Sequence, residues 1–354
     1  MKLRITTFNV QNMFNRYAFL DQPFTGRDFE QTVMATGVVS LASQQGDLVP
    51  YATTTIQRNN TALAILDAQP DILAVQEIEN IYTLRNFNEQ YLGNYFGHVI
   101  SIDGNDPRGI DVGLLIKRNF TGPDHKDLKS LTVGGIRTHI DEAANKKEMV
   151  SRRYIGQLGG KAAYLAPNAI FSRDCLEVDV VIEKKDGTKK TLTLLVNHLK
   201  SQLGGKPSDE RRLKQSTRVA AIVNENVAAG RLPVVLGDLN ADASLKNGTS
   251  VHPLTKHPEL QDPFGLPLKK TTTWTHFFDS GGGEVSRLDY VLPHKSLVVN
   301  PVEVDALDAN TSIVRKGLTT KCHQYPMALT RYPTIGPVDT EASDHCPVTI
   351  VLEL

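Results

Sequence analysis

The sequence has few cysteines, a single tryptophan and no long apolar run. Its 354 residues include only Cys175, Cys322 and Cys346, which lie far apart and form no pattern typical of a disulfide framework or a zinc ribbon. No window approaches the roughly 18 uninterrupted apolar residues that a membrane helix needs, so no membrane segment is expected. Lysine plus arginine equals aspartate plus glutamate, 39 each, so any polyanion must be held by local positive charge.

The beginning of the sequence, MKLRITTFNV, alternates apolar and polar residues and shows no apolar export signal. The default expectation is a cytoplasmic location, with secretion as the alternative if a signal has been removed. No linker or internal repeat divides the sequence. We therefore expect a single domain over residues 1–354, acting as a monomer, with loop insertions near 16–57, 119–168 and 241–284 that could carry substrate contacts.

Short runs rich in β-branched residues and bounded by Gly, Pro, Asn or Asp predict strands. They cover residues 2–10, 71–78, 111–118, 175–184, 191–199, 232–240, 287–293 and 347–354. Amphipathic patterns predict helices over 59–69 and 208–230. Because strands outnumber helices and tight turns join several neighbours, the sequence predicts packed, largely antiparallel sheets flanked by helices.

Acid, amide and imidazole side chains gather at the ends of these strands. Carboxylate and amide oxygens are ligands for Mg²⁺, Mn²⁺ or Ca²⁺, whereas histidines can bind phosphate or move protons near neutral pH. If the strands share one sandwich, these side chains converge on one rim and suit hydrolysis at phosphorus. The residues are Asn9, Glu77, His198, Asp238, Asn240, Asp289, Asp344 and His345.

Each of these residues also has a purely structural interpretation. Asn9 could cap a turn, the GDLN segment at 237–240 could be an Asx turn, and His198 could be a core histidine with satisfied hydrogen bonds. Glu77 is harder to explain in this way, because it ends an apolar run and would be buried without a compensating cation. The joint occurrence of all of them favours a functional site.

The segment ASDHCPV at 342–348 could be a metal site, a Cys-His nucleophile pair, or an oriented histidine beside an uninvolved cysteine. Adjacent residues of an extended segment point to opposite faces, so His345 and Cys346 do not readily form an attacking pair. No other cysteine or histidine lies at zinc-ligand spacing. We therefore interpret Cys346 as a small buried residue at the start of the last strand.

Seven segments, TFNVQN, QEIE, RGIDVGLLIKR, NHLKS, GDLNA, RLDYV and SDHCPV, occur in this order between residues 6 and 348. This series resembles the motif series of the endonuclease/exonuclease/phosphatase family, whose members are deoxyribonuclease I-like. The resemblance implies a four-layer α/β sandwich, in which two packed mixed sheets, largely antiparallel, carry outer helices.

The resemblance also implies roles at a metal and at the attacking water. Glu77 matches the principal metal-binding glutamate, Asn9 the asparagine beside it, and Asp344 an additional residue on the metal side. The implied ion is Mg²⁺, with Mn²⁺ or Ca²⁺ as alternatives. Asp238 matches the residue that orients or deprotonates the attacking water, and Asn240 its partner at the phosphate.

Further roles are implied for the histidines. His345 matches the histidine that binds the scissile phosphate, and Asp289 the carboxylate that pairs with it. His198 matches a second histidine found in the deoxyribonuclease I-like branch, for which Asp111 is the candidate orienting acid.

Substrate contacts are expected from nearby cations. We interpret Arg108, near Asp111, as a phosphate or substrate clamp, in preference to the alternative that the two residues form a surface salt bridge of little value. Arg173 lies where the family often shows an Arg-Pro pair, but Asp174 replaces the proline. Lys200 begins a basic stretch that follows His198 and could carry a polyanion backbone. Two aromatic residues, Trp274 and Tyr290, could stack on bases or belong to the core.

The expected function is metal-dependent hydrolysis of nucleic acid by in-line attack of water on phosphorus. A DNA endonuclease of low sequence specificity is favoured by the histidine of NHLKS and by the long insertions, with RNA as another possible substrate. One alternative is a lipid or inositol-phosphate phosphodiesterase or phosphatase of the sphingomyelinase type, which would be expected to show an exposed aromatic hairpin. A second alternative is a catalytically inactive binding module. It is disfavoured because every position expected to be essential for catalysis holds a suitable residue.

Overall fold

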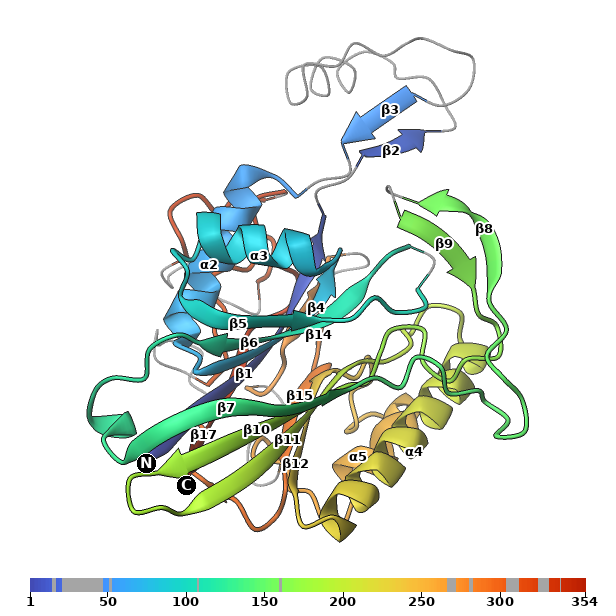
Figure 1. Ribbon diagram of the computed structural model, residues 1–354. Coiled ribbons are helices and arrows are strands. Elements are labelled where there is room, and N and C mark those ends of the chain that lie inside the picture. The colour runs from blue at the N-terminus through green and yellow to red at the C-terminus, as the bar shows by residue number, and fades with distance from the viewer. Residues whose placement is uncertain are drawn as a thin grey trace.

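Two β-sheets packed face to face form the centre of the computed structural model (Figure 1). The structure describes residues 1–14, 17–20, 47–50, 53–106, 108–158, 161–265, 272–279, 283–303, 312–323, 331–337 and 339–354. The six-stranded sheet has the order β16 (Val298–Val299), β17 (Val348–Glu353), β1 (Lys2–Met13), β4 (Ile72–Ile78), β6 (Asp111–Lys117) and β5 (Phe96–Ser101). The five-stranded sheet has the order β15 (Asp289–Pro293), β12 (Leu232–Asp238), β11 (Lys189–His198), β10 (Leu176–Lys184) and β7 (Leu128–Arg137).

Both sheets are mixed. The pairs β1/β4 and β11/β12 are parallel, and the other neighbouring strands of the two large sheets are antiparallel. Parallel pairing requires a crossover connection, and a helix lies between the strands of each of these two pairs. The predicted sandwich of largely antiparallel, mixed sheets is therefore confirmed.

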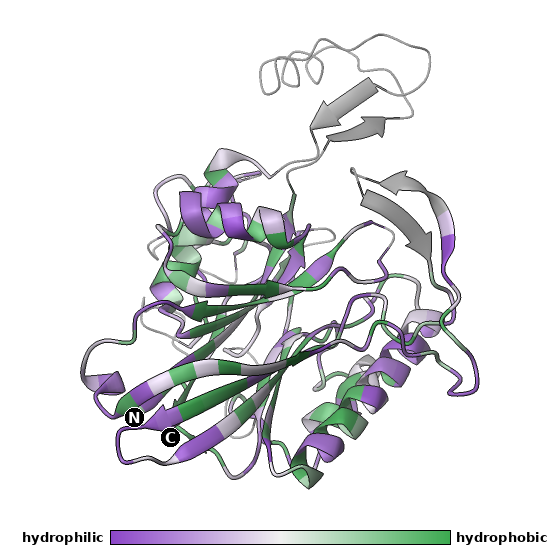
Figure 2. Cartoon of the chain, viewed as in Figure 1, coloured by the Kyte–Doolittle hydropathy of each residue, from purple (hydrophilic) through white to green (hydrophobic). Residues whose placement is uncertain are grey.

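Successive side chains of each strand point to opposite faces of the sheet, and this divides the core into layers. On β11, Leu194 and Val196 face the other sheet, whereas Leu195 packs outward with Val219 and Ile222 of the helix α4 (Lys206–Ala228). Figure 2 shows this pattern as apolar strands at the centre and polar outer faces on the helices. One buried cluster therefore lies between the sheets, and two others lie under the outer helices.

The outer layers are helical. The helices α2 (Thr55–Ala68) and α3 (Ile81–Gln90) cover the six-stranded sheet, and α4 (Lys206–Ala228) with the short α5 (His252–Thr255) covers the five-stranded sheet (Figure 1). A capping box between Thr54 and Gln57 starts α2. Within the described residues, no helix is long and apolar enough to cross a membrane.

Each predicted strand and helix is present, with ends that differ by a few residues. The 119–168 region is not wholly a loop insertion, because it contains β7, which pairs with β10 in the five-stranded sheet. It also holds the paired strands β8 (Arg153–Leu158) and β9 (Lys161–Leu165), and the 3₁₀ turn η1 (Pro123–His125). The helix α3 and the strand β5 (Phe96–Ser101) were also not predicted from the sequence.

The other two predicted insertions also contain regular elements. Most of 16–57 lies outside the described residues, which there form β2 (Tyr17–Leu20) and β3 (Asp47–Pro50). The 241–284 region contains the 3₁₀ turn η2 (Lys246–Val251), α5 and β13 (His276–Phe278), and its last residue begins β14 (Glu284–Ser286), which forms a hairpin with β13. This hairpin matters for the site, because its residues reach the cleft described below.

Candidate active site

The candidate catalytic side chains lie at one edge of the sandwich. Asp238 ends β12, and its register partners are His198 at the end of β11 and Asp289 at the start of β15. Because β15 runs antiparallel to β12, its first residue lies where β12 ends. The strand β17 likewise runs antiparallel to β1, so His345, just before β17, lies beside the C-terminal part of β1. Strand direction therefore explains why positions distant in sequence meet here.

The end of β12 has an unusual backbone. Gly237 has φ of +135°, and a Cβ atom there would lie 1.9 Å from the backbone oxygen of Asn197. Only glycine allows β12 to approach β11 this closely just before Asp238. Asn240 follows with φ of +56°, which favours a tight turn.

Asp238 is held by amide groups from three directions. Its Oδ2 accepts hydrogen bonds of 3.0 Å from Nδ2 of Asn9 and from Nδ2 of Asn240, and its Oδ1 accepts from the backbone N–H of Asn240 at 2.8 Å. Nε2 of His198 lies 3.4 Å from the same Oδ2. Burial raises the pKa of Asp238 to about 7, although the charge of His345 opposes this increase.

His345 and Asp289 form a buried pair. Nδ1 of His345 donates to Oδ2 of Asp289 at 2.8 Å, and Thr275 Oγ1 donates to the same oxygen at 2.7 Å. Burial disfavours the charged imidazole, but the negative charges of Asp289 and Asp238 outweigh burial and hold the pKa of His345 well above its ordinary value. The predicted contact between His345 and Asp289 is therefore present.

Glu77 lies on a distorted part of β4. Its φ is +64°, and the pairing register shifts between Gln76 and Ile78. The backbone N–H of Asn12 donates to Oε2 of Glu77 at 3.0 Å. Burial, followed by repulsion from Asp344, raises the pKa of Glu77. A strained residue that directs a destabilised carboxylate to a site is a feature of functional centres.

His198 contacts different acids from the one predicted. Its Nε2 lies 3.4 Å from Asp238 and 3.7 Å from Oε1 of Glu77, and its Nδ1 has no hydrogen-bond partner among the described residues. Asp111 instead accepts a hydrogen bond from Gly104 N–H at 2.8 Å. The predicted pairing of His198 with Asp111 is wrong, because Asp111 holds the 104–111 loop. Burial lowers the pKa of His198 far below its ordinary value.

An arginine pair shares one acid beside the cluster. Arg108 places Nε and Nη2 each 3.3 Å from Asp106, and Nε of Arg173 lies 3.0 Å from the same carboxylate without hydrogen-bond geometry. Burial opposes ionisation of Asp106, but Arg173 and Arg108 lower its pKa. The sequence did not single out Asp106, although an acid two residues before Arg108 was a usable signal. Asp174 accepts from the backbone N–H of His139 at 2.8 Å.

A cleft of about 530 Å³ opens over these groups. Lys200 and Asp111 are not among the described residues that line it, so the structure does not bring these two predicted substrate contacts to the cleft. Asn9 and Asp289 also lie behind the lining and act through Asp238 and His345. The polar lining includes Glu77, Arg108, Arg173, His198, Asp238, Asn240, His276, Asp344 and His345.

A model of the endonuclease/exonuclease/phosphatase family matches residues 7–345. The chain belongs to this family. Members of the endonuclease/exonuclease/phosphatase family are hydrolytic phosphoesterases that generally use a divalent metal ion. No protein with a curated description matches the chain.

Solved structures share the fold of this family member at low sequence identity. One is an endonuclease/exonuclease/phosphatase from Bacteroides vulgatus, with 13% identity, a TM-score of 0.50, and coverage of 100% of this chain and 99% of that one. Another is a mannosyl-6-phosphatase from Bacteroides thetaiotaomicron, with 14% identity, a TM-score of 0.50, and coverage of 99% and 100%. The human Nocturnin catalytic domain with bound sulfate has 14% identity, a TM-score of 0.50, and coverage of 99% and 93%. At these identities the likeness shows the fold.

The residues present fit the divalent cation that this family generally uses. Burial, and after it repulsion from Asp344, raises the pKa of Glu77, and a cation bound by these two carboxylates would offset both effects. The amide oxygen of Asn9 already accepts a hydrogen bond from the backbone N–H of Gln11 at 3.0 Å. Oxygen donors of this kind suit Mg²⁺, Mn²⁺ or Ca²⁺.

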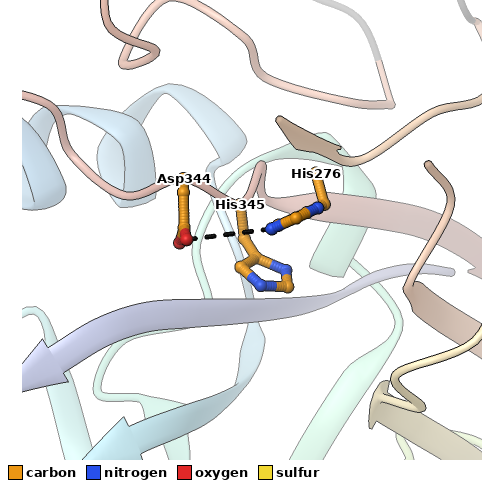
Figure 3. A group of neighbouring side chains, drawn as sticks. All are labelled: His276, Asp344 and His345. Carbon is orange, nitrogen blue, oxygen red and sulfur yellow. Dashed lines mark ion pairs between the residues drawn. The ribbon is translucent and has the colours of Figure 1, made fainter. Parts of the chain in front are cut away.

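His276 belongs to the site and was missed in the sequence. Its Nε2 lies 3.8 Å from Oδ2 of Asp344, and its ring centroid lies 4.6 Å from that of His345 (Figure 3). Ligand atoms of these three residues lie within 4.8 Å of one another and could also hold a metal ion. Nδ1 of His276 lies 3.4 Å from Ser286 Oγ, which orients the ring. The sequence signal for this residue was a histidine in the segment WTHFF, which lies between the predicted strands at 232–240 and 287–293.

Other sequence candidates belong to the core. Trp274 is 5% exposed, with the guanidinium of Arg315 4.2 Å above its ring, and Tyr290 is 1% exposed. Neither of these two aromatic rings can therefore stack on a base. Cys346 is buried and unpaired, as predicted, and burial raises the pKa of its thiol.

Proposed function

We propose that this protein is a Mg²⁺-dependent phosphodiesterase that hydrolyses nucleic acid, with DNA as the main substrate, as an endonuclease of low sequence specificity. The observation that carries the proposal is the arrangement of His345 and Asp238. Nε2 of the imidazole lies 3.9 Å from Oδ2 of the carboxylate. A cationic imidazole and a carboxylate whose pKa is near 7 thus lie side by side in one cleft.

This arrangement divides the work of hydrolysis between an acid and a base. Asp238, fixed by Asn9 and Asn240, takes a proton from the attacking water, because a base with a pKa near the working pH is the most effective. The water oxygen forms the new bond to phosphorus as the opposite ester bond breaks. His345, kept protonated by Asp289, donates to a phosphoryl oxygen as negative charge develops there.

The cation would be held by the carboxylates of Glu77 and Asp344. A bound cation would neutralise the negative charge on the phosphoryl oxygens and on the leaving oxygen. Arg108 and Arg173 add fixed positive charge along the cleft wall, which suits the negative backbone of a polynucleotide.

The hairpin of β13 and β14 favours nucleic acid over lipid. A lipid-directed enzyme would be expected to present an apolar hairpin tip to the bilayer. The residues that join β13 to β14 in the sequence, DSGGG at 279–283, include no apolar side chain. The exposed aromatic ring of this hairpin, Phe278, lines the cleft beside His276.

A substrate panel tests the proposal. The protein is incubated with plasmid DNA, single-stranded DNA, RNA, bis(p-nitrophenyl) phosphate, p-nitrophenyl phosphate, and vesicles of sphingomyelin or phosphoinositide, each with Mg²⁺ or with EDTA. EDTA-sensitive plasmid nicking is the expected result. No EDTA-sensitive product from any substrate would refute the enzyme, and lipid or monoester turnover without nucleic-acid cleavage would refute the nuclease.

A further inference from the structure

The cleft has an apolar rim made of three exposed side chains. Leu203 is 79% exposed, Phe278 is 50% exposed and Leu245 is 49% exposed, and all three line the cleft that holds His345. They come from the segment before α4, from β13 and from the segment before η2. Large apolar side chains gathered at one cleft mark a binding surface, whereas single ones scattered over a protein do not.

The strand β13 presents Phe278 on the same face as His276. Residues two apart on a strand share a face, and Phe277 between them is 2% exposed and packs in the core. The rings of His276 and Phe278 are nearly parallel, at an angle of 26° with centroids 6.4 Å apart. Since the His276 ring also lies beside His345, Phe278 is only one ring removed from the proposed phosphate-binding imidazole.

We propose that Phe278, with Leu203 and Leu245, forms a subsite for an unpaired nucleobase next to the scissile phosphate. This subsite rests on the proposed nuclease function and specifies it further. An exposed aromatic face stacks on any base, because every base has a π-face. In a duplex the faces of a base are covered by its stacked neighbours, so a base must leave the stack to expose a face, and the enzyme would prefer single-stranded or locally opened DNA.

The surroundings of the rim favour a base over an acyl chain. The lining that holds these apolar side chains also includes polar ones, among them Gln202, Asp242 and Glu284. An acyl chain needs a continuous apolar channel, whereas a base has polar edges that such groups can bond. Phe278 pairs directly with Glu284 across the hairpin, so an acceptor lies next to the aromatic face.

The test uses single-stranded oligonucleotides with one defined cleavage position, in which each base in turn is replaced by an abasic tetrahydrofuran. For the wild type, we expect one replacement beside the cleaved phosphate to raise KM about tenfold, the size of one base–aromatic stack. In Phe278→Ala, the intact substrate should show that increase already, and the same replacement should have little further effect. Phe278→Trp should restore the wild-type pattern.

The control variant is Tyr82→Ala, which removes a 72% exposed ring on α3 that does not line the cleft. It should leave every KM unchanged, and thermal melts should show that both alanine variants fold. Equal sensitivity to each abasic position in wild type and Phe278→Ala would overturn the subsite while leaving the nuclease intact. Absence of EDTA-sensitive cleavage of any oligonucleotide would overturn the nuclease itself. Loss of sphingomyelin turnover in Phe278→Ala, with cleavage of oligonucleotides unchanged, would assign the rim to lipid.

Discussion

His345 donates a hydrogen bond of 2.8 Å from Nδ1 to Asp289, 56 residues earlier in the chain and at the edge of the other sheet. The bond fixes the orientation of the ring and leaves Nε2 directed toward Asp238, 3.9 Å away. Burial alone would make the imidazole neutral and the carboxylate of Asp238 protonated. The negative charge of Asp289 reverses this for His345 only, so two neighbouring groups are set to opposite roles by their environments.

The pH dependence of kcat/KM should show this division. We expect activity to rise with pH through about 7, as Asp238 loses its proton and becomes a base. Activity should fall only well above pH 6.5, where His345 loses the proton that it donates to phosphate. In Asp289→Asn the pKa of His345 should fall, so the alkaline limb should move toward neutral pH. Stopped-time assays of nucleic-acid cleavage between pH 5 and 10 measure both limbs.

The control for that profile is Asp71→Asn. Asp71 forms a comparable buried pair with His125, with Nε2 of the imidazole 3.0 Å from Oδ2, but neither residue lines the cleft. This variant should change stability and leave both limbs in place. An alkaline limb that is the same in Asp289→Asn and in the wild type would show that Asp289 does not control the protonation of His345.

Asp238→Asn and His345→Ala should each reduce the rate by at least about a hundredfold, the loss expected when one well-aimed electrostatic or basic group is removed. Asparagine keeps the size and shape of Asp238 while the base is lost, but its amide nitrogen cannot accept the hydrogen bonds that one carboxylate oxygen now accepts, so a modest loss of stability should accompany the loss of rate. Circular dichroism and thermal melts should show native folding in both variants. Near-wild-type activity of either variant would contradict the assignment of these residues.

Glu77 should control the binding of the divalent ion. The pKa of Glu77 is raised by burial and by Asp344, so a bound cation relieves a repulsion present in the folded protein. Adding Mg²⁺ should therefore raise the Tm of the wild type, because an ion that binds only the folded state stabilises it. In Glu77→Gln the Tm without Mg²⁺ should be equal or higher, and its response to Mg²⁺ should be largely lost. An undiminished response in Glu77→Gln would place the ion elsewhere.

The strands of the fold and most polar residues of the site could be predicted because each follows from local sequence. Short runs rich in β-branched residues and bounded by turn residues predicted the strands, and Asp238, His345 and Asp289 lie at or near the ends of these runs. Contacts between different strands and helices were harder to predict from the sequence. His276 was missed because its role depends on an isolated β-bridge with His345, which is distant in sequence. The strand β7 was missed because it lies at the edge of its sheet, has no buried residue and contains two adjacent glycines, so it lacks an apolar run.

The partner of His198 was predicted wrongly for a related reason. The family resemblance suggested Asp111 as its orienting acid, but the carboxylate of Asp111 instead accepts a hydrogen bond from the backbone N–H of Gly104. Likewise, the exposed ring at the cleft is Phe278, whereas the aromatic residues selected from the sequence are buried. Which face of a strand points to a cleft depends on packing between layers, which a single sequence does not specify.

A charged network outside the cleft should make stability depend on pH. His139 bonds Oε1 of Glu142 at 2.7 Å through Nδ1 and Oε2 of Glu177 at 2.9 Å through Nε2, so both ring nitrogens donate and the imidazole is charged. Burial opposes this charge, but the two hydrogen-bonded carboxylates raise the pKa of His139 to about 9. Despite burial, the bonds to His139 lower the pKa of Glu142 and of Glu177 to about 2.

The signs of these shifts define where the network stabilises the fold. The raised pKa of His139 gives stability that is complete below its ordinary value of 6.5 and is lost as pH rises through about 9. The lowered pKa values of the glutamates give stability that is complete above 4.5 and is lost as pH falls through about 2. His139→Gln should therefore lower the free energy of unfolding by about 2 kcal/mol at pH 5.5, and by clearly less at pH 9.5. Urea denaturation at both values measures the difference, with exposed His98→Gln as the matched control, and equal destabilisation at both pH values would show that the charge of His139 contributes nothing.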